Sequence, residues 1–248
     1  MTTNQHFWRI FFRTLNKLLT VIFVCCIVFV LLMDMNLLAV NKPIKLFVAL
    51  GKLNYGVAIS YIAAYVFYLI TIHFYETKTS ISLYQAADFP AAAIVTNIYG
   101  IFIEMAKTHD MNLKREELNE SKIRDILNST KCFNESTLSS PEKGFPKYNW
   151  VEYINITNNK IKDYYKNLYP IYNKLDGDYI SALSNLEQVD FVKPITGFLW
   201  AETTINKTNK EEIFFTDAMA DILLDLYLKA KIVNDVVEKR RSIYEIKA

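Results

Sequence analysis

The stretch GVAISYIAAYVFYLITIHFYE, Gly56–Glu76, is long and apolar enough to cross a membrane, and tyrosines recur in it at helical spacing. A helix needs about 20 predominantly apolar residues to span the hydrocarbon core of a bilayer. A tyrosine hydroxyl at that depth needs a hydrogen-bond partner, which lipid does not offer. We therefore expect Tyr61, Tyr65 and Tyr68 to face protein or water, where they would line a seam or a pore.

Small residues form a second face of the same helix. When the stretch is placed on a helical wheel at about 100° per residue, one sector holds Gly56, Ser60, Ala63 and Ala64. Small side chains let two helices approach closely in lipid, where apolar burial provides no drive for association. This face is therefore expected to pack against another helix, which is either the first span of the same chain or a second copy.

A first apolar run precedes this stretch. Residues 18–33, LLTVIFVCCIVFVLLM, carry no charge, and the run continues past Asp34 to Leu38. A signal peptide is the competing interpretation, but the run is too long for one and no small-residue cleavage site follows it. We expect two transmembrane helices, at about 18–38 and 53–75, which form an antiparallel hairpin in a membrane domain of residues 1–76.

Aromatic residues and cations alternate ahead of the first span. Arg9, Arg13 and Lys17 are four residues apart, so they share one face of a helix. Aromatic rings favour the headgroup region of a bilayer, and cations there interact with anionic lipid. The expected membrane-interface anchors are Trp8, Arg9, Arg13, Lys17 and Tyr75.

Charge is distributed unevenly along the chain. Residues 1–75 hold six Lys or Arg and one acid, whereas residues 76–248 hold 22 Lys or Arg and 25 acids. The cations flanking the first span are equally numerous on its two sides, so the positive-inside rule does not orient the hairpin. A large domain with one cysteine, Cys132, follows the second span and favours a reducing compartment. We therefore expect both termini on the cytoplasmic side of a bacterial inner membrane.

Residues 77–248 read as a soluble, all-helical bundle with mixed charge. The most apolar piece, residues 84–107, is either a third span or a buried helix. It contains Pro90, and Asp88 and Glu104 bracket only about 15 uncharged residues, a length that suits a buried or interfacial helix better. The predicted fold class is thus all-α, with an N-terminal transmembrane hairpin followed by a cytosolic helical bundle.

Capping residues mark further helices in this bundle. Asp176 is expected to cap a helix that contains Tyr179, Leu183 and Leu186. Thr208 and Glu211 have capping-box spacing and predict the start of the long last helix. Residues 129–147, rich in serine, proline and glycine, predict a loop.

No catalytic signature stands out in the sequence. The glycines are scattered singly, so no phosphate-binding loop is present, and no histidine has a second histidine or cysteine at metal-site spacing. Asp217, Asp221 and Asp225 recur every four residues, which indicates a solvated acidic face or, alternatively, a Mg²⁺ or Ca²⁺ site. We expect no enzyme, no cofactor, no metal and no small-molecule substrate.

A small basic cluster, EKRRS at 238–242, lies near the end of the last helix. Its cations either complement the negative end of the helix dipole or contact anionic lipid or nucleic acid.

The hairpin, the motif SYIAAYVFYL in the second span and the motif LDGDYISALSNLEQVDF in the helical tail carry a resemblance. Together they resemble bacterial two-transmembrane proteins similar to the two-transmembrane effectors of retron-type antiphage defence systems. The resemblance implies membrane permeabilisation once a sensor releases the tail, with a regulatory protein or ribonucleoprotein as partner. It supplies no catalytic residues.

The leading hypothesis is therefore a regulated membrane-disrupting effector whose helical domain, or a partner, keeps it inactive. On release, spans would self-associate in the bilayer through Gly56, Ser60 and Ala64. A membrane-anchored adaptor whose bundle binds a protein or nucleic acid is the alternative. A channel subunit is a weaker alternative, because neither span carries a charge near its middle.

Overall fold

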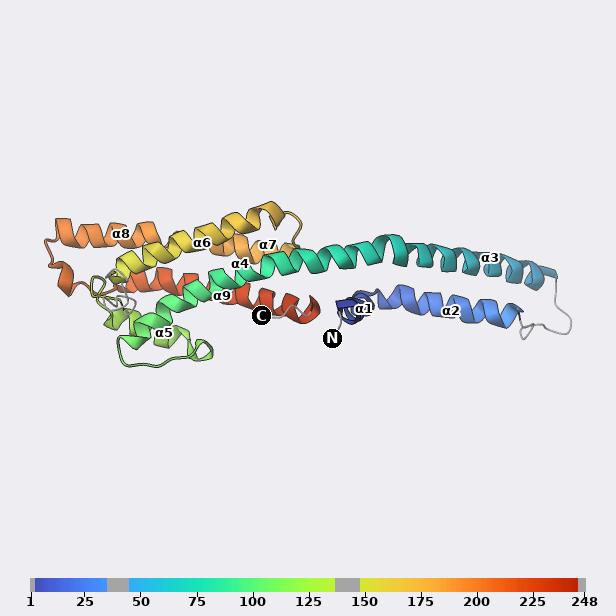
Figure 1. Cartoon of the computed structure of the whole chain (residues 1–248), viewed down its shortest axis with the longest axis horizontal. Helices are drawn as coiled ribbons and strands as arrows, with labels where there is room; N and C mark the ends of the chain where they lie inside the picture. The colour runs from blue at the N-terminus through green and yellow to red at the C-terminus, as the bar shows by residue number, and fades with distance from the viewer. Residues whose placement is uncertain (1–2, 35–44, 137–147, 245–248) are drawn as a thin grey trace. The chain divides into compact units, whose positions relative to one another are not determined.

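The computed structural model describes residues 3–34, 45–136 and 148–244, with side chains from residue 7 onward except those of residues 45–50. The described residues are helical and include no β-strand (Figure 1). This agrees with the predicted all-α class. The chain divides into two compact units, Met1–Ser82 and Leu83–Ala248.

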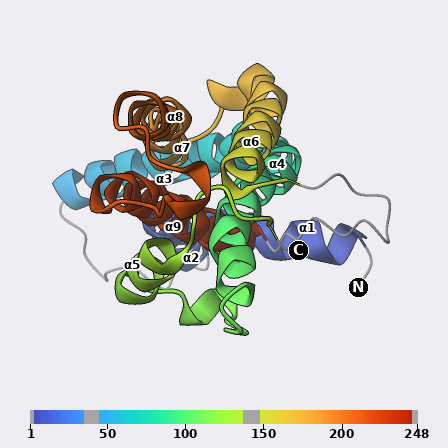
Figure 2. The ribbon, with the colours of Figure 1, turned by 90° about the vertical axis from the view of Figure 1, so that its left-hand side faces the viewer.

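Unit 1 contains two apolar helices that run side by side. Its elements are α1 (Thr3–Thr14), α2 (Lys17–Asp34), α3 (Lys45–Phe67), the π-helix η1 (Tyr68–His73) and the start of α4 (Phe74–Lys107). The Asn16 side chain caps α2, since it accepts hydrogen bonds from the backbone N–H groups of Leu18 (3.1 Å) and Leu19 (3.3 Å). The chain turns at this cap, and α1 runs crosswise to α2 (Figures 1 and 2).

Two helices in the described part of the chain are long and apolar enough to cross a membrane. The first is α2, with a mean hydropathy of 2.5, and the second lies within residues 51–107, with a value of 1.8. Residues 35–38, the end of the first expected span, lie outside the described residues.

The helix that carries the second expected span is longer than residues 53–75. α3, η1 and α4 follow one another without a break, because Phe67 and Phe74 at the two junctions keep helical backbone angles. Residues 77–83, TKTSISL, hold neither glycine nor proline, so nothing in them ends a helix. The helix therefore runs from Lys45 to Lys107.

Unit 2 is a helical bundle around the second half of α4. Its other elements are η2 (Arg115–Glu117), α5 (Glu120–Ser129), α6 (Trp150–Tyr172), α7 (Gly177–Glu187), α8 (Val192–Trp200), the π-helix η4 (Ala201–Ile205), η5 (Lys210–Glu212) and α9 (Asp217–Tyr244). The helix α9 packs between α5 and α7 (Figure 2). Ile94, Ile98 and Phe102 of α4 are fully buried in this core. The segment 84–107 is thus the core helix of unit 2, as its short uncharged length predicts.

The capping predictions had different outcomes. The carboxylate of Asp176 accepts a hydrogen bond from the Tyr179 N–H (3.1 Å), which confirms it as the cap of α7. The prediction that the last helix starts at Thr208 is wrong, since α9 begins at Asp217. Residues 213–215 are instead held in extended form, because the Cys132 N–H donates to the Ile213 carbonyl (2.8 Å). Tertiary pairing therefore overrides the local capping signal.

Candidate functional site: a tyrosine seam in the helical hairpin

A hydrogen bond between two hydroxyls joins the hairpin helices near the start of α2. Tyr65 of α3, only 4% exposed, lies 2.7 Å from the Thr20 hydroxyl of α2. The Thr20 hydroxyl already donates its proton to the Asn16 carbonyl (2.8 Å). Because a hydroxyl has one proton to donate, Tyr65 is the donor in the pair. The two apolar helices are therefore joined by a polar contact at this level.

Two further tyrosines extend this contact along the helices. The Tyr61 hydroxyl donates to the Leu19 carbonyl (3.0 Å), and the Tyr55 hydroxyl donates to the Asp34 carboxylate (2.9 Å). Tyr55 contacts Asp34 at the end of α2, whereas Tyr65, farther along α3, contacts Thr20 near the start of α2, so the two helices are antiparallel. We call these contacts the tyrosine seam. It comprises Tyr55, Tyr61, Tyr65 and His73 with their partners on α1 and α2, and Tyr68, whose ring lies between those of Tyr65 and His73.

His73 closes the other end of the seam. Its Nε2 lies 2.9 Å from the Phe11 carbonyl, and the side chain is 4% exposed. A carbonyl only accepts hydrogen bonds, so Nε2 carries a proton and donates. No local pattern in the sequence marks His73 as a seam residue. Its hydrogen bond joins α1 to the long helix, together with the ring contacts that Phe74 makes with α1.

The π-helix η1 is what brings His73 onto the seam. In an α-helix, residues five apart lie on different faces, whereas residues three or four apart share one. A π-helix bonds residues i and i+5, so Tyr68 and His73 fall on one face. Their rings stack with centroids 5.9 Å apart, and the series continues through the Tyr65–Tyr68 pair at 6.0 Å. The rings of Tyr61, Tyr65, Tyr68 and His73 therefore form one aromatic ladder.

The small-residue face points away from the seam. Gly56, Ser60, Ala63 and Ala64 are all exposed, and a methyl group added at Gly56 would meet no atom within 4 Å. The interpretation in which this face packs on the first span of the same chain is therefore wrong. The tyrosines pack against α2 instead. Their rings provide contact area, and their hydroxyls find hydrogen-bond partners on α2.

The expected interface anchors lie at one end of the hairpin. Trp8 is 47% exposed and Tyr75 is 67% exposed, while Lys17 is exposed at the start of α2. Arg9 and Arg13 are also exposed, although each has an interaction partner. The aromatic rings near them form one cluster of Phe7, Trp8, Phe11, Phe12 and Phe74.

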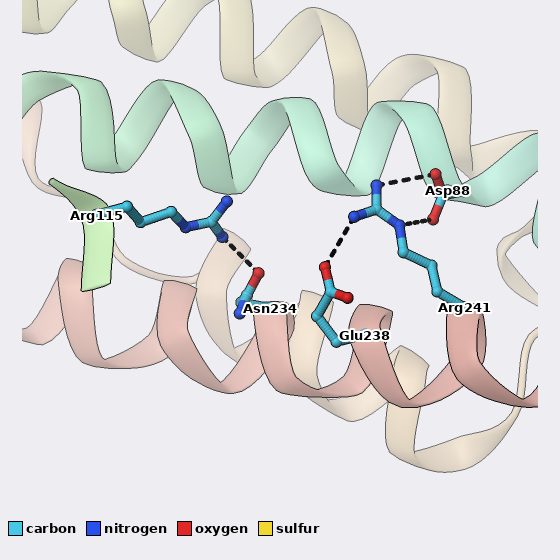
Figure 3. A network of polar contacts seen from close by, with 5 residues as sticks. All are labelled: Asp88, Arg115, Asn234, Glu238 and Arg241. Carbon is cyan, nitrogen blue, oxygen red and sulfur yellow. Dashed lines mark hydrogen bonds and ion pairs between the residues drawn. The ribbon is translucent and has the colours of Figure 1, made fainter. Parts of the chain in front are cut away.

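In unit 2, the basic cluster at the end of α9 contacts acids of the bundle itself. Arg241 forms a two-point ion pair with Asp88 of α4 (Nε–Oδ1 2.6 Å, Nη2–Oδ2 3.0 Å) and also contacts Glu238 (2.8 Å). Figure 3 shows these contacts, together with the hydrogen bond from Arg115 to Asn234 farther along α9. The hydrogen bonds to Asp88 raise the pKa of Arg241. We call the contacts of Arg241 with Asp88 and Glu238 the α9 clamp.

The neighbouring arginine extends the clamp to α7. Arg240 pairs with Asp176 at 2.9 Å, and the Tyr84 hydroxyl donates to the same carboxylate. Burial raises the pKa of Tyr84, so its hydroxyl stays protonated. Burial alone raises the pKa of Asp176, but hydrogen bonds from Tyr84 and the Tyr179 N–H, with the charge of Arg240, lower it overall. Two of the cluster's cations are thus used to hold α9 against α4 and α7.

The three regularly spaced aspartates at the start of α9 also have partners. Asp221 pairs with Arg124 (2.7 Å), Asp225 pairs with Lys229 (3.0 Å), and Asn128 donates to Asp217 (3.4 Å). Among the described residues, no group of three possible metal ligands comes together.

The partners of the seam on α1 and α2 could not be predicted from the sequence, because they lie far along the chain from the residues they contact. Thr20, Asp34 and Phe11 contact the seam across more than 20 residues of chain, and no local pattern marks them. The antiparallel arrangement of the two spans was the one signal that could have placed Thr20 opposite Tyr65.

No protein-family model matches the chain, and comparison with curated proteins and with solved structures found no match either. The geometry of the two units is therefore the basis for inferring function.

Proposed function

We propose that the chain is a regulated membrane-disrupting effector of a bacterial defence module. Its hairpin inserts in the inner membrane with both termini in the cytoplasm. The helical unit 2, alone or with a regulatory protein or ribonucleoprotein, holds the hairpin inactive. On release, hairpins from several copies associate and make the bilayer leaky.

One observation carries this proposal. The hydroxyls of Tyr55, Tyr61 and Tyr65 find partners on α2 within the hairpin. The small-residue face, Gly56, Ser60, Ala63 and Ala64, remains exposed. A face of small residues in lipid favours close packing of one helix on another, because the backbones can approach. Since no side chain of the chain's described part covers Gly56, a second copy is the occupant we propose.

Association through this face leaves the seam intact. Tyr61 and Tyr65 keep their bonds to Leu19 and Thr20 while the adjacent small-residue face packs on a neighbour. The tyrosines would then seal each hairpin, and the leak would form between hairpins. This differs from the expectation that the tyrosines themselves line a pore, which would require the Thr20–Tyr65 bond to open.

Dye influx in cells tests the proposal. Expression of the full chain under its triggering condition should depolarise the inner membrane and admit a membrane-impermeant dye. Gly56→Leu with Ser60→Leu should abolish the influx, because two large side chains prevent close backbone approach.

A matched control keeps the comparison fair. Val57→Leu with Ile59→Leu also places leucine at two exposed positions of the same helix, but outside the small face, and should leave the influx unchanged. Equal loss of influx in both variants would contradict the role of the small face. Absence of depolarisation under every triggering condition would contradict the effector itself.

A membrane-anchored adaptor is the second candidate, and one observation favours it. Phe198, Trp200 and Ile205, on α8 and η4, are 44%, 62% and 64% exposed. Exposed large apolar side chains can mark a protein interface, and these three lie on consecutive helices of unit 2. Replacing residues 1–76 with an unrelated membrane anchor separates the two functions, because an adaptor retains activity after the exchange and an effector loses it.

A further inference from the structure

A concave site lies in unit 2, away from the α9 clamp. It is a pocket of about 510 Å³ between α6 and the segment that joins α7 to α8. Its floor is apolar and belongs to the core, with Ile98 of α4, Ile161 of α6 and Leu226 of α9 each at most 5% exposed. The volume falls within the range of about 300–1,000 Å³ typical of small-molecule sites.

One wall of the pocket is a polar ridge on α6. Asn155, Asn158, Asn159 and Lys162 follow one another at helical spacing and all line the pocket. The half-buried Asn158 and its two neighbouring amides make no hydrogen bond with other described residues. A carboxamide donates and accepts at once, so it can pair with the edge of a heteroaromatic base. The ridge therefore presents three unused amides above an apolar floor.

The pocket lining carries charges of both signs, and one lysine in it is available for an anionic group. The lining includes Lys162, Lys166 and Lys193 against Glu187 and Asp190. Two of these lysines are paired, Lys166 with Asp163 (2.7 Å) and Lys193 with Asp190 (3.6 Å).

The remaining acid, Glu187, accepts a hydrogen bond from the Tyr169 hydroxyl, which orients the carboxylate and leaves its charge in place. Lys162 forms no ion pair with any described residue, and it adjoins the amides. Lys162 is thus the lysine of the lining whose ammonium is not held by an acid of the described part of the chain, and it lies at the end of the amide ridge.

We infer that this pocket binds a nucleotide, with the base between the α6 amides and the apolar floor and the phosphate at Lys162. The apolar floor supports the flat face of the base, and the amides read its edge. A lysine ammonium is a suitable point-charge partner for phosphate. This inference concerns binding by unit 2 only, so it stands whether the hairpin permeabilises membranes or merely anchors the chain.

Calorimetric titration of the full chain in detergent micelles tests it. The probes are AMP, GMP, CMP and UMP, with adenosine and inorganic phosphate as fragments. We expect saturable binding of at least one nucleotide at one site per chain, with adenosine and phosphate each weaker on the order of tenfold or more. Asn158→Leu and Lys162→Glu should each weaken that nucleotide on the order of tenfold or more.

Lys160→Glu supplies the matched control. Lys160 is exposed on the same helix but does not line the pocket, so the variant should bind like the parent chain. The thermal midpoint of every variant shows whether it is folded. The inference is overturned if no nucleotide binds saturably at millimolar concentration. Equal weakening in Lys160→Glu would overturn it too, because the effect would then come from net charge.

Discussion

The Tyr65 hydroxyl shows how one polar atom decides the packing of an apolar helix. In lipid, a helix gains nothing by burying leucine or isoleucine against another helix, since the surrounding tails are equally apolar. A hydroxyl with no partner, however, is costly at that depth. Tyr65 removes this cost by donating to Thr20, and the α3 face that carries it turns toward α2.

We expect Tyr65→Phe to destabilise the hairpin by about 0.6 kcal/mol, and by no more than about 2 kcal/mol. Only the hydroxyl is lost, while the ring keeps its contact with Phe23 at 4.5 Å. Unfolding in mixed detergent micelles measures the change, and a double-mutant cycle with Thr20→Val isolates the pair. Tyr75→Phe is the control, because Tyr75 is 67% exposed, and an equal cost there would refute the assignment.

At the scale of the element, η1 adjusts the register of the long helix. Tyr61, Tyr65 and Tyr68 follow the four- and three-residue spacing of an α-helix, and His73 then comes five residues after Tyr68. One extra residue is accommodated as a π-helical turn, which keeps His73 on the seam side. Such turns often occur at functional sites; here the turn secures α1 through the Phe11 carbonyl.

Deleting Ile70 should therefore be tolerated. Ile70 is 68% exposed within η1, and its loss leaves Tyr68 and His73 four apart, still on one face of a regular α-helix. Deleting Ile59 from α3 should disrupt the hairpin, because it rotates Tyr55 by about 100° relative to Tyr61 and Tyr65. Thermal unfolding in detergent distinguishes the two deletions. If deletion of Ile70 is as damaging as deletion of Ile59, η1 does not have this register role.

The α9 clamp is a stability feature that can be tested by the same kind of measurement. Arg241→Met leaves the Asp88 carboxylate, 9% exposed, without its partner, and we expect a loss of about 3–5 kcal/mol in unfolding free energy. The double variant Asp88→Leu with Arg241→Met should recover most of it, since an apolar pair removes the buried charge. Denaturant unfolding followed by circular dichroism measures both.

Lys231→Met provides the reference for this clamp experiment. Lys231 is exposed on α9 and should change the free energy of unfolding by no more than about 0.5 kcal/mol. If Asp88→Leu with Arg241→Met is as unstable as Arg241→Met alone, the loss in unfolding free energy comes from packing and not from the uncompensated charge of Asp88.

For the whole molecule, the question is whether its two apolar helices reside in a bilayer. We expect the chain to stay in the membrane pellet after alkaline carbonate washing and to be released by detergent. Val24→Lys with Val28→Lys places two charges on the middle of α2, where both valines are about half exposed. Each charge costs roughly 2.5–3.5 kcal/mol at the centre of a span, so membrane retention should fall sharply. Ile232→Lys, at an exposed site on α9, should be retained like the parent chain.

Full release of the parent chain by carbonate would argue against insertion. Retention of the Val24→Lys and Val28→Lys variant would show that α2 is not the membrane-embedded element. Either outcome would also remove the basis for the effector proposal, while leaving the nucleotide pocket of unit 2 untouched.

By itself, the sequence determined the all-helical class, the two apolar helices and the need of Tyr61, Tyr65 and Tyr68 for partners. These follow from composition, helical periodicity and the chemistry of a hydroxyl, which act within one segment of chain. Which partner each group finds was decided by the tertiary structure. The tyrosines rather than the small residues face α2, η1 turns His73 inward, and Arg241 is occupied by Asp88. Each of these contacts joins residues more than 40 positions apart, so its energy exists only after the helices have packed.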